Sequence, residues 1–271
     1  MEAYSELSAT FIDQPRPEAA RPGPLRARLP LVLLHGFSQT AKSWGPVVEA
    51  LGDQFPLVLP DAPGHGASSE LAADLWVTAE LLAAKLGRKA FWAGYSMGGR
   101  TALHVALARP DVVQRLVLIS STAGIEDPAE REARRAADEL LATRLERDGV
   151  AAFLRDWLAQ PMFATLPRDN AGLPARLANT PAGLASSLRL AGSGTQEPLW
   201  DRLGELAGRS LPVLLVAGER DQKYLRLAER LAAAIGPSAV LLVVEGAGHA
   251  CHLERPAEVA AAIAAFCAGP L

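Results

Sequence analysis

FWAGYSMGGR, residues 91–100, runs from an apolar strand, through a serine that lies between glycines, into a helix. Gly94, Ser96 and Gly98 form the pattern G-x-S-x-G, which is typical of a sharp strand-to-helix turn that exposes the serine hydroxyl and strains its backbone. Glycine at the flanking positions lets the strand and the helix approach closely. The free N–H groups at the helix N-terminus favour negative charge beside that hydroxyl. Ordinary glycine-rich turns show the same pattern, so its meaning depends on the rest of the chain.

The chain around this segment alternates between strands and helices. A short β-like run at residues 8–13 predicts an edge strand, followed by an irregular connection rich in proline and arginine. Apolar runs predict buried strands at 29–34, 55–59, 90–94, 116–119, 211–217 and 239–244, and helical periodicity predicts helices at 40–51, 71–86, 97–108, 223–235 and 256–266. Strands that alternate with helices indicate an α/β fold with a parallel sheet and right-handed crossovers.

Residues 122–208 interrupt this alternation. They hold amphipathic helical segments rich in arginine, glutamate and alanine, broken by several prolines, and no strand-like apolar run. We expect a helical lid at 122–208, inserted into an α/β body formed by residues 1–121 and 209–271.

Composition narrows the class of function. The chain has 271 residues, 49% of them apolar, which is enough for one sizeable core with an insertion. A net charge of −3 and an aromatic share of 6% disfavour a nucleic-acid interface. We find no signal peptide and no apolar run long enough to insert in a membrane. Cys251 and Cys267 show no metal-ligand spacing, so we expect two packed, reduced thiols and a cytoplasmic location. We also expect a monomer or a small homo-oligomer.

Two polar residues at strand ends fit the serine. Asp221 follows the strand at 211–217 and His249 follows the strand at 239–244. Taken alone, the aspartate is equally well a helix cap and the histidine an ordinary loop residue. The chain order Ser96, Asp221, His249 is nevertheless that of the triads of α/β-hydrolases, in which the histidine takes the serine proton and the aspartate orients the histidine. The joint placement favours a catalytic triad.

The end of the first buried strand predicts the oxyanion hole. His35-Gly36-Phe37 lies where this fold places one of the two N–H donors, so the backbone N–H of Phe37 would pair with that of Met97. His35 braces this loop in our interpretation, and His65 and His104 are structural as well. His252 lies three residues after His249, but a third ligand is missing, and we expect no metal site.

Arg100 distinguishes this chain from a plain esterase. It lies one helical turn after Ser96, on the same face of the helix. A guanidinium there makes sense if the substrate carries a carboxylate, although an arginine that faces solvent or an internal ion pair would fit the same position. Arginines also crowd the first helix of the insertion at 131, 134 and 135, and most of that run is a solvated face.

Several motifs together resemble one family. They are H-G-F-S at 35–38, D-A-P-G-H-G at 61–66, G-Y-S-M-G-G-R at 94–100, the stretch 124–135, D-W-L-A-Q-P-M-F-A at 156–164, G-E-R-D-Q-K at 218–223 and G-A-G-H-A-C-H at 246–252. From residue 29 onward the chain resembles the 2-succinyl-6-hydroxy-2,4-cyclohexadiene-1-carboxylate synthases of menaquinone biosynthesis, which have the α/β-hydrolase fold.

The resemblance implies a lyase that eliminates pyruvate from 2-succinyl-5-enolpyruvyl-6-hydroxy-3-cyclohexene-1-carboxylate, without metal or organic cofactor. It implies that Ser96, Asp221 and His249 form the triad and that Phe37 and Met97 supply the oxyanion donors. Arg100 and Arg134 would then anchor carboxylates, and Tyr95 and Trp157 would line the pocket. The choice of Arg134 over its neighbours rests on the gap-free spacing from Ser96 to Trp157.

Two other functions remain compatible with the sequence. A serine carboxylesterase or a carbon–carbon bond hydrolase of the same fold would use the same triad. A receptor whose lid closes over a small molecule would share the fold without the catalysis, because a fold does not fix a function. Arg100 and the arginines of the insertion argue for an enzyme that acts on a small-molecule carboxylate.

Overall fold

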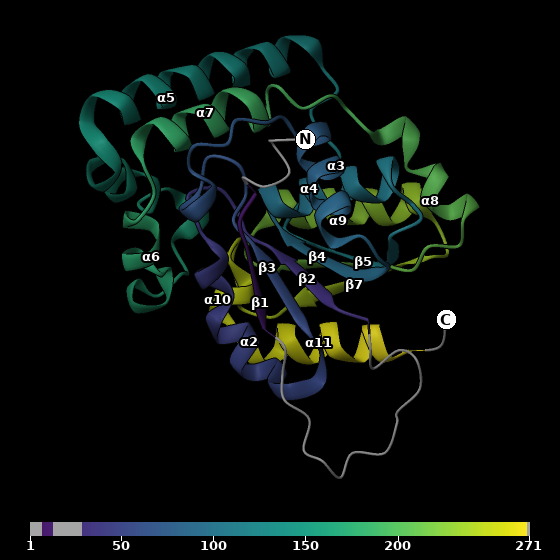
Figure 1. Cartoon of the computed structure of the whole chain (residues 1–271). Helices are drawn as coiled ribbons and strands as arrows, with labels where there is room; N and C mark the ends of the chain where they lie inside the picture. Colours follow the sequence, from purple (N-terminus) through teal and green to yellow (C-terminus); the bar gives the residue numbers. More distant parts are fainter. Residues whose placement is uncertain (1–6, 13–28, 270–271) are drawn as a thin grey trace.

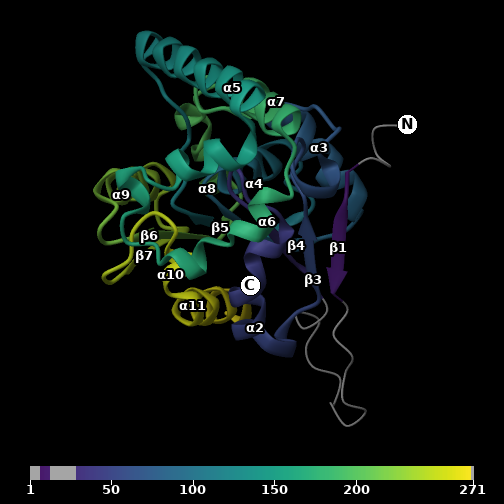
Figure 2. The same cartoon turned by 90° about the vertical axis from the view of Figure 1, so that its left-hand side faces the viewer.

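A computed structural model describes residues 7–12 and 29–269. Its described strands form one sheet in the order β1-β3-β2-β4-β5-β6-β7. Strands β2 to β7 pair in parallel, and β1 pairs with β3 in the antiparallel sense at one edge, as Figure 2 shows. The strands are β1 (Ala9–Ile12), β2 (Leu31–Leu34), β3 (Leu57–Pro60), β4 (Ala90–Tyr95), β5 (Val113–Ile119), β6 (Val213–Gly218) and β7 (Ala239–Val244). The predicted α/β class and its edge strand are confirmed.

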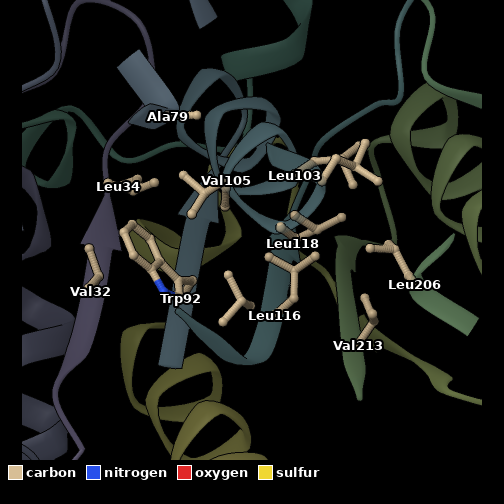
Figure 3. Close-up of a cluster of buried hydrophobic side chains, with 14 of the residues drawn as sticks. Val32, Leu34, Ala79, Trp92, Leu103, Val105, Leu116, Leu118, Leu206 and Val213 are labelled. Carbon is tan, nitrogen blue, oxygen red and sulfur yellow. The ribbon is translucent and has the colours of Figure 1, made fainter. Parts of the chain in front are cut away.

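Helices cover both faces of the sheet (Figure 1). One face carries α3 (Leu75–Leu86), α4 (Met97–Ala108), α8 (Gly204–Gly208) and α9 (Gln222–Ile235), and the other carries α2 (Gly45–Leu51), α10 (Cys251–Glu254) and α11 (Pro256–Ala268). The central strands are mostly apolar because their alternate residues enter opposite cores. In β4, Trp92 lies in the first core, and Phe91 and Ala93 lie in the second. Figure 3 shows Trp92 among the residues of the first core.

Most predicted elements agree with the structure to within a few residues. The helix expected at 71–86 begins only at Leu75, because the Asp74 side chain caps it by accepting a hydrogen bond from the N–H of Val77. The helix expected at 40–51 is divided into a 3₁₀ turn, η2 (Ala41–Trp44), and α2. The strand expected at 116–119 is longer, since β5 starts at Val113.

The segment between β5 and β6 is helical. It holds α5 (Pro128–Trp157), α6 (Leu173–Leu177), α7 (Pro181–Ala191) and the short α8, with 3₁₀ turns η5 (Pro161–Phe163), η6 (Arg168–Ala171) and η7 (Trp200–Arg202) between them. A small core of its own joins α5 to α7, built around Leu145, Phe153 and Leu184. On the outer side Arg189 of α7 pairs with Glu139 and Glu146 of α5. In Figure 1, helices α5 and α7 lie above the sheet.

No described helix, in residues 7–12 and 29–269, is both long and apolar enough to cross a membrane.

The turn from β4 into α4 is a tightly packed junction. Ser96 adopts φ 52°, a left-handed conformation that is rare outside glycine. A Cβ atom on Gly94 would lie 2.1 Å from the carbonyl oxygen of Gly98, and one on Gly98 would lie 2.1 Å from that of Leu34. Both contacts involve backbone atoms, which have little freedom to move. The glycines of G-x-S-x-G are therefore required by close approach.

We predict that Gly98→Ala lowers the free energy of unfolding by about 1–3 kcal/mol, the usual cost of overpacking. Thermal unfolding followed by circular dichroism measures the change. Gly204→Ala is the matched control, because a Cβ atom on this exposed helical glycine meets nothing within 4 Å. Equal stability of the two variants would contradict the close contact with Leu34.

Candidate active site

Three side chains from three loops meet at the carboxyl end of the sheet. His249 Nδ1 lies 2.6 Å from Asp221 Oδ2, and His249 Nε2 lies 3.2 Å from Ser96 Oγ. In the tautomer that donates from Nδ1 to the aspartate, Nε2 accepts the serine proton. The His249 side chain is 1% exposed and that of Asp221 8%, so water competes little for these bonds. The geometry is that of a nucleophile or base, its proton acceptor and an orienting carboxylate.

Asp221 fulfils both of the roles between which its sequence position left a choice. Its Oδ2 atom bonds His249, and its Oδ1 atom accepts a hydrogen bond of 3.3 Å from the N–H of Tyr224, which caps helix α9. A carboxylate has two oxygens, so the cap and the histidine contact do not compete. The cap fixes the orientation of the carboxylate, and the carboxylate orients the imidazole.

Two backbone N–H groups belong to residues that line the same cavity as the serine. Phe37 and Met97 both line the cavity beside Ser96. Among the described residues, neither N–H has a recorded acceptor, whereas those of Gly36 and Ser38 donate to Gln39 and His65. An unpaired N–H that borders a cavity is available to a ligand oxygen. These are the two positions at which the sequence predicts oxyanion donors.

The histidines outside the triad are structural. His35 Nε2 accepts a hydrogen bond from the N–H of Ala62, and His65 Nε2 accepts one from Ser38, so the two rings brace the loops around Phe37. Burial, together with the neighbouring His35, lowers the pKa of His65 to about 3, so it stays neutral and keeps its acceptor. His104 donates to the carbonyl of Arg100 within α4 and packs on Trp76.

His252 lies beneath the site. Its ring packs on Tyr95 at 4.1 Å and on Trp44 at 4.9 Å, and burial holds its pKa well below the usual value. Tyr95 in turn contacts the ring of His249 at 5.3 Å. Within the described part of the chain, no group of three or more histidine, cysteine or acidic side chains is arranged to hold a metal ion.

A cavity of about 600 Å³ opens above the serine. It lies between the sheet and the inserted helices. Every residue that the sequence assigns to the site lines it, namely Phe37, Tyr95, Ser96, Met97, Arg100, Arg134, Trp157, Asp221 and His249. Trp157, at the end of α5, packs against Phe37 at 5.2 Å, so the insertion directly contacts the loop with the oxyanion donor.

Two of the predicted arginines face this cavity from opposite elements. Arg100 of α4 is buried and donates from Nη1 to Gln196 Oε1 at 3.2 Å, and burial lowers its pKa to about 10. Arg134 of α5 donates from Nε to Asp138 Oδ1 at 2.8 Å. Its neighbours are engaged elsewhere, since Arg131 donates to the carbonyl of Ile125 and Arg135 pairs with Glu132. Both cavity arginines keep further N–H donors.

The sequence analysis did not assign several residues that line the cavity, among them Arg176, Arg220, Lys223 and Tyr224. Arg176 of α6 is 1% exposed and donates to Ser38 Oγ at 2.6 Å and to the carbonyl of Ala171 at 2.7 Å. Burial lowers its pKa to about 10, so it remains charged at neutral pH. Tyr224 packs on the ring of His249 at 4.4 Å. The sequence contained only weak signs that Arg176 and Tyr224 belong to the site. Arg176 lies within the mostly apolar stretch 173–177, and Tyr224 lies one helical turn after Asp221.

Known proteins share this architecture. A sequence profile described as the Alpha/beta hydrolase family matches residues 31–262. The 2-succinyl-6-hydroxy-2,4-cyclohexadiene-1-carboxylate synthase of Klebsiella pneumoniae (strain 342) is 34% identical over 241 residues, covering 86% of this chain and 92% of that protein. The protein of the same name from Serratia proteamaculans (strain 568) is 32% identical over 252 residues, with coverages of 89% and 93%.

Solved structures agree with these relatives. The structure of MenH from S. aureus matches with a TM-score of 0.84 at 29% identity, covering 95% of this chain and 97% of that one. A thermophilic esterase from Thermogutta terrifontis, solved with malate bound, matches with a TM-score of 0.76 at 25% identity, with coverages of 95% and 92%.

The buried His104 predicts a pH dependence of folding. Burial lowers its pKa to about 4, whereas the unfolded chain has the ordinary value near 6.5. Above about pH 6.5 the imidazole of His104 is mostly neutral in both the folded and the unfolded state. As the pH falls from about 6.5 to 4, the unfolded state binds a proton that the folded state excludes, so stability falls by up to about 1.4 kcal/mol per pH unit from this residue.

We expect His104→Asn, whose amide can still donate to the carbonyl of Arg100, to show a shallower loss of stability over this range. Urea unfolding at a series of pH values measures the slope. Wild type and variant should have the same slope between pH 7 and 8. An unchanged slope below pH 6.5 would show that His104 titrates normally in the folded protein.

Proposed function

Because the chain belongs to the 2-succinyl-6-hydroxy-2,4-cyclohexadiene-1-carboxylate synthase family of alpha/beta hydrolases, we propose that its cavity carries out the elimination that gives this product. The protein is a lyase that releases pyruvate from 2-succinyl-5-enolpyruvyl-6-hydroxy-3-cyclohexene-1-carboxylate. One observation carries this conclusion for the site itself. The serine, histidine and aspartate share a single cavity with four arginines, Arg100, Arg134, Arg176 and Arg220.

Elimination requires a base at carbon. We propose that Ser96, as it gives its own proton to His249 Nε2, removes the ring proton of the substrate. The electrons of that C–H bond, at C2 beside the succinyl carbonyl, form the C2=C3 double bond. The C3=C4 double bond of the ring shifts to C4=C5, and the bond from C5 to the enolpyruvyl oxygen breaks. Asp221 stabilises the imidazolium that forms, which can return its proton to the departing pyruvate. Serine is a poor base alone, so the step depends on the 3.2 Å contact with the histidine.

The N–H groups of Phe37 and Met97 support the same step. Loss of a proton next to a carbonyl or carboxylate places negative charge on oxygen. Fixed donors that point at this oxygen stabilise the charge without having to reorganise during the reaction. The two groups that lack acceptors beside Ser96 would supply this stabilisation.

The guanidiniums suit a substrate with several carboxylates. Arg100 and Arg176 are buried with pKa values of about 10, so both remain charged at neutral pH. A buried cation that lacks a full counter-ion binds a carboxylate strongly, because the ligand replaces the water that burial removed. We assign Arg100 and Arg134 to one carboxylate and Arg176 to another. Tyr95 and Trp157 form apolar walls for the ring.

We also propose the division of labour within the chain. Within the insertion at 122–208, helices α5 to α7 act as the lid, while α8 packs on the sheet. Residues 1–121 and 209–271 form the body. One chain supplies all of the cavity lining, so a monomer suffices, and a small homo-oligomer is equally compatible. Cys251 and Cys267 are both free and buried, as is usual in a reducing compartment such as the cytoplasm.

The deciding experiment compares two activities. Pyruvate release from the enolpyruvyl substrate, coupled to NADH oxidation by lactate dehydrogenase, should be fast, and p-nitrophenyl ester hydrolysis should be slow. Intact-protein mass spectrometry after an acid quench should show only the unmodified chain. Ester hydrolysis without pyruvate release, or a substrate adduct on Ser96 that decays at the turnover rate, would instead indicate a carboxylesterase or carbon–carbon bond hydrolase.

Replacing any member of the triad should remove most of the turnover. We expect Ser96→Ala, Asp221→Asn and His249→Gln each to lower kcat by about 10²–10⁴. Combined substitutions should add little, because the three residues act as one unit. Pyruvate release measures the loss, and circular dichroism confirms the fold. Near-normal turnover by Ser96→Ala would exclude serine as the base.

Arginine substitutions should act on substrate binding. We expect Arg100→Ala to reduce kcat/KM. The loss should correspond to about 1.5–3 kcal/mol of transition-state stabilisation, which is the usual contribution of a charge-assisted hydrogen bond. Arg134→Ala should change kcat/KM in the same direction. Arg135→Ala is the matched control, since this neighbour pairs with Glu132 and is 54% exposed. If Arg134→Ala and Arg135→Ala behaved alike in pyruvate release, Arg134 would not be an anchor.

A further inference from the structure

The turn at residues 192–196, with the sequence Gly-Ser-Gly-Thr-Gln, has no part in the mechanism above, yet it forms part of the cavity wall. It follows α7, and Gly192 and Ser193 line the cavity. The N–H groups of Thr195 and Gln196 both donate to the carbonyl of Gly192, at 3.2 and 3.1 Å. The Thr195 hydroxyl donates to the carbonyl of Arg189 at 2.9 Å. The 192–196 turn is therefore held in one conformation.

Its glycines pack directly against α5. A Cβ atom on Gly194 would lie 2.3 Å from the backbone nitrogen of Arg135, and one on Gly192 would lie 2.6 Å from Asp138 Oδ2. The N–H of Gly194 also points to Asp138 Oδ2, at 3.5 Å. Only residues without a side chain permit so close an approach. The turn and α5 thus hold each other in place at the cavity.

This junction reaches both of the cavity arginines assigned to one carboxylate. Gln196 accepts from Nη1 of Arg100, and Asp138 accepts from Nε of Arg134. Asp138 is 2% exposed and Gln196 3%, so both acceptors are shielded from water, whereas the side chain of Arg134 is 36% exposed. Each partner occupies one part of a planar guanidinium and thereby fixes its plane. The N–H groups that remain have a defined direction.

Asp138 is a surprising residue for this place. A buried carboxylate beside a site for anions repels the ligand, and by charge alone its removal should strengthen binding. Its retention makes sense if holding Arg134 in the binding geometry is worth more than the repulsion. A flexible arginine would have to give up side-chain entropy on binding, and a fixed one has already done so.

We propose that Asp138 and Gln196 are positioning residues, which hold the guanidiniums of Arg134 and Arg100 in the orientation that binds a substrate carboxylate. The inference rests on the proposed role of these arginines as anchors. It assigns the G-S-G-T-Q turn a function in substrate selection.

The test separates position from charge. Asp138→Ala removes both the acceptor and the charge, whereas Asp138→Asn removes the charge and retains an acceptor oxygen. We expect KM for pyruvate release to rise about tenfold in Asp138→Ala and to stay within about threefold of wild type in Asp138→Asn, with kcat little changed in both. Glu132→Ala, an exposed acid on the same helix, is the control. If both Asp138 variants lowered KM, charge alone would matter and the inference would be wrong.

A second variant and a second measurement keep the test decisive. Gln196→Leu removes the acceptor for Arg100 with little change in volume, and it should raise KM about five- to tenfold. Isothermal titration with 2-(3-carboxypropanoyl)benzoate, an unreactive aromatic analogue of the product, should show the same order of affinities. If wild type binds the analogue but releases no pyruvate, the proposed reaction fails, and positioning is judged from the titrations alone. If Gln196→Leu and Asp138→Ala bound the analogue as tightly as wild type does, the positioning role of these two residues would be wrong.

Discussion

The backbone of Gly98 lies so close to the carbonyl of Leu34 that a single methyl group would not fit between them. This contact brings the start of α4 against the ends of β2 and β4. Ser96 has to turn the chain within one residue, and it does so at φ 52°. The serine hydroxyl is consequently displayed at the carboxyl edge of the sheet, with the first N–H groups of α4 beside it. The loop that carries Phe37, our proposed oxyanion donor, depends on the same junction because it continues directly from β2.

At that edge, individual side chains combine structural and chemical roles. Asp221 caps α9 with one oxygen and orients His249 with the other. Asp138 fixes Arg134 and also holds the turn that supports Gln196. Using one carboxylate for two contacts keeps the number of buried charges low. Each additional buried carboxylate would lose hydration and would need its own polar partners.

The fold is common to enzymes with different chemistry, as the match to an esterase with bound malate illustrates. The triad can serve acyl transfer or proton abstraction, and the cavity above it selects between them. Here that cavity is lined by guanidiniums from α4, α5 and α6, two of them held by partners on the 192–196 turn and α5. Charge that is buried and oriented favours a polyanionic substrate, in agreement with the synthase family to which the chain belongs.

The sequence by itself determined the sheet, the elbow and the positions of the triad, because strand periodicity, glycine spacing and chain order are local properties. It also singled out Arg100 and Arg134, the first by helical spacing from Ser96 and the second by resemblance. Only the tertiary structure decided that Arg176 enters the cavity and that Gln196 holds Arg100, whereas Asp138 lies four residues after Arg134 on the same helix. Gln196 and Arg100 lie 96 residues apart in the chain. Contacts of this kind leave no local pattern, since they arise when the insertion between β5 and β6 packs over the sheet.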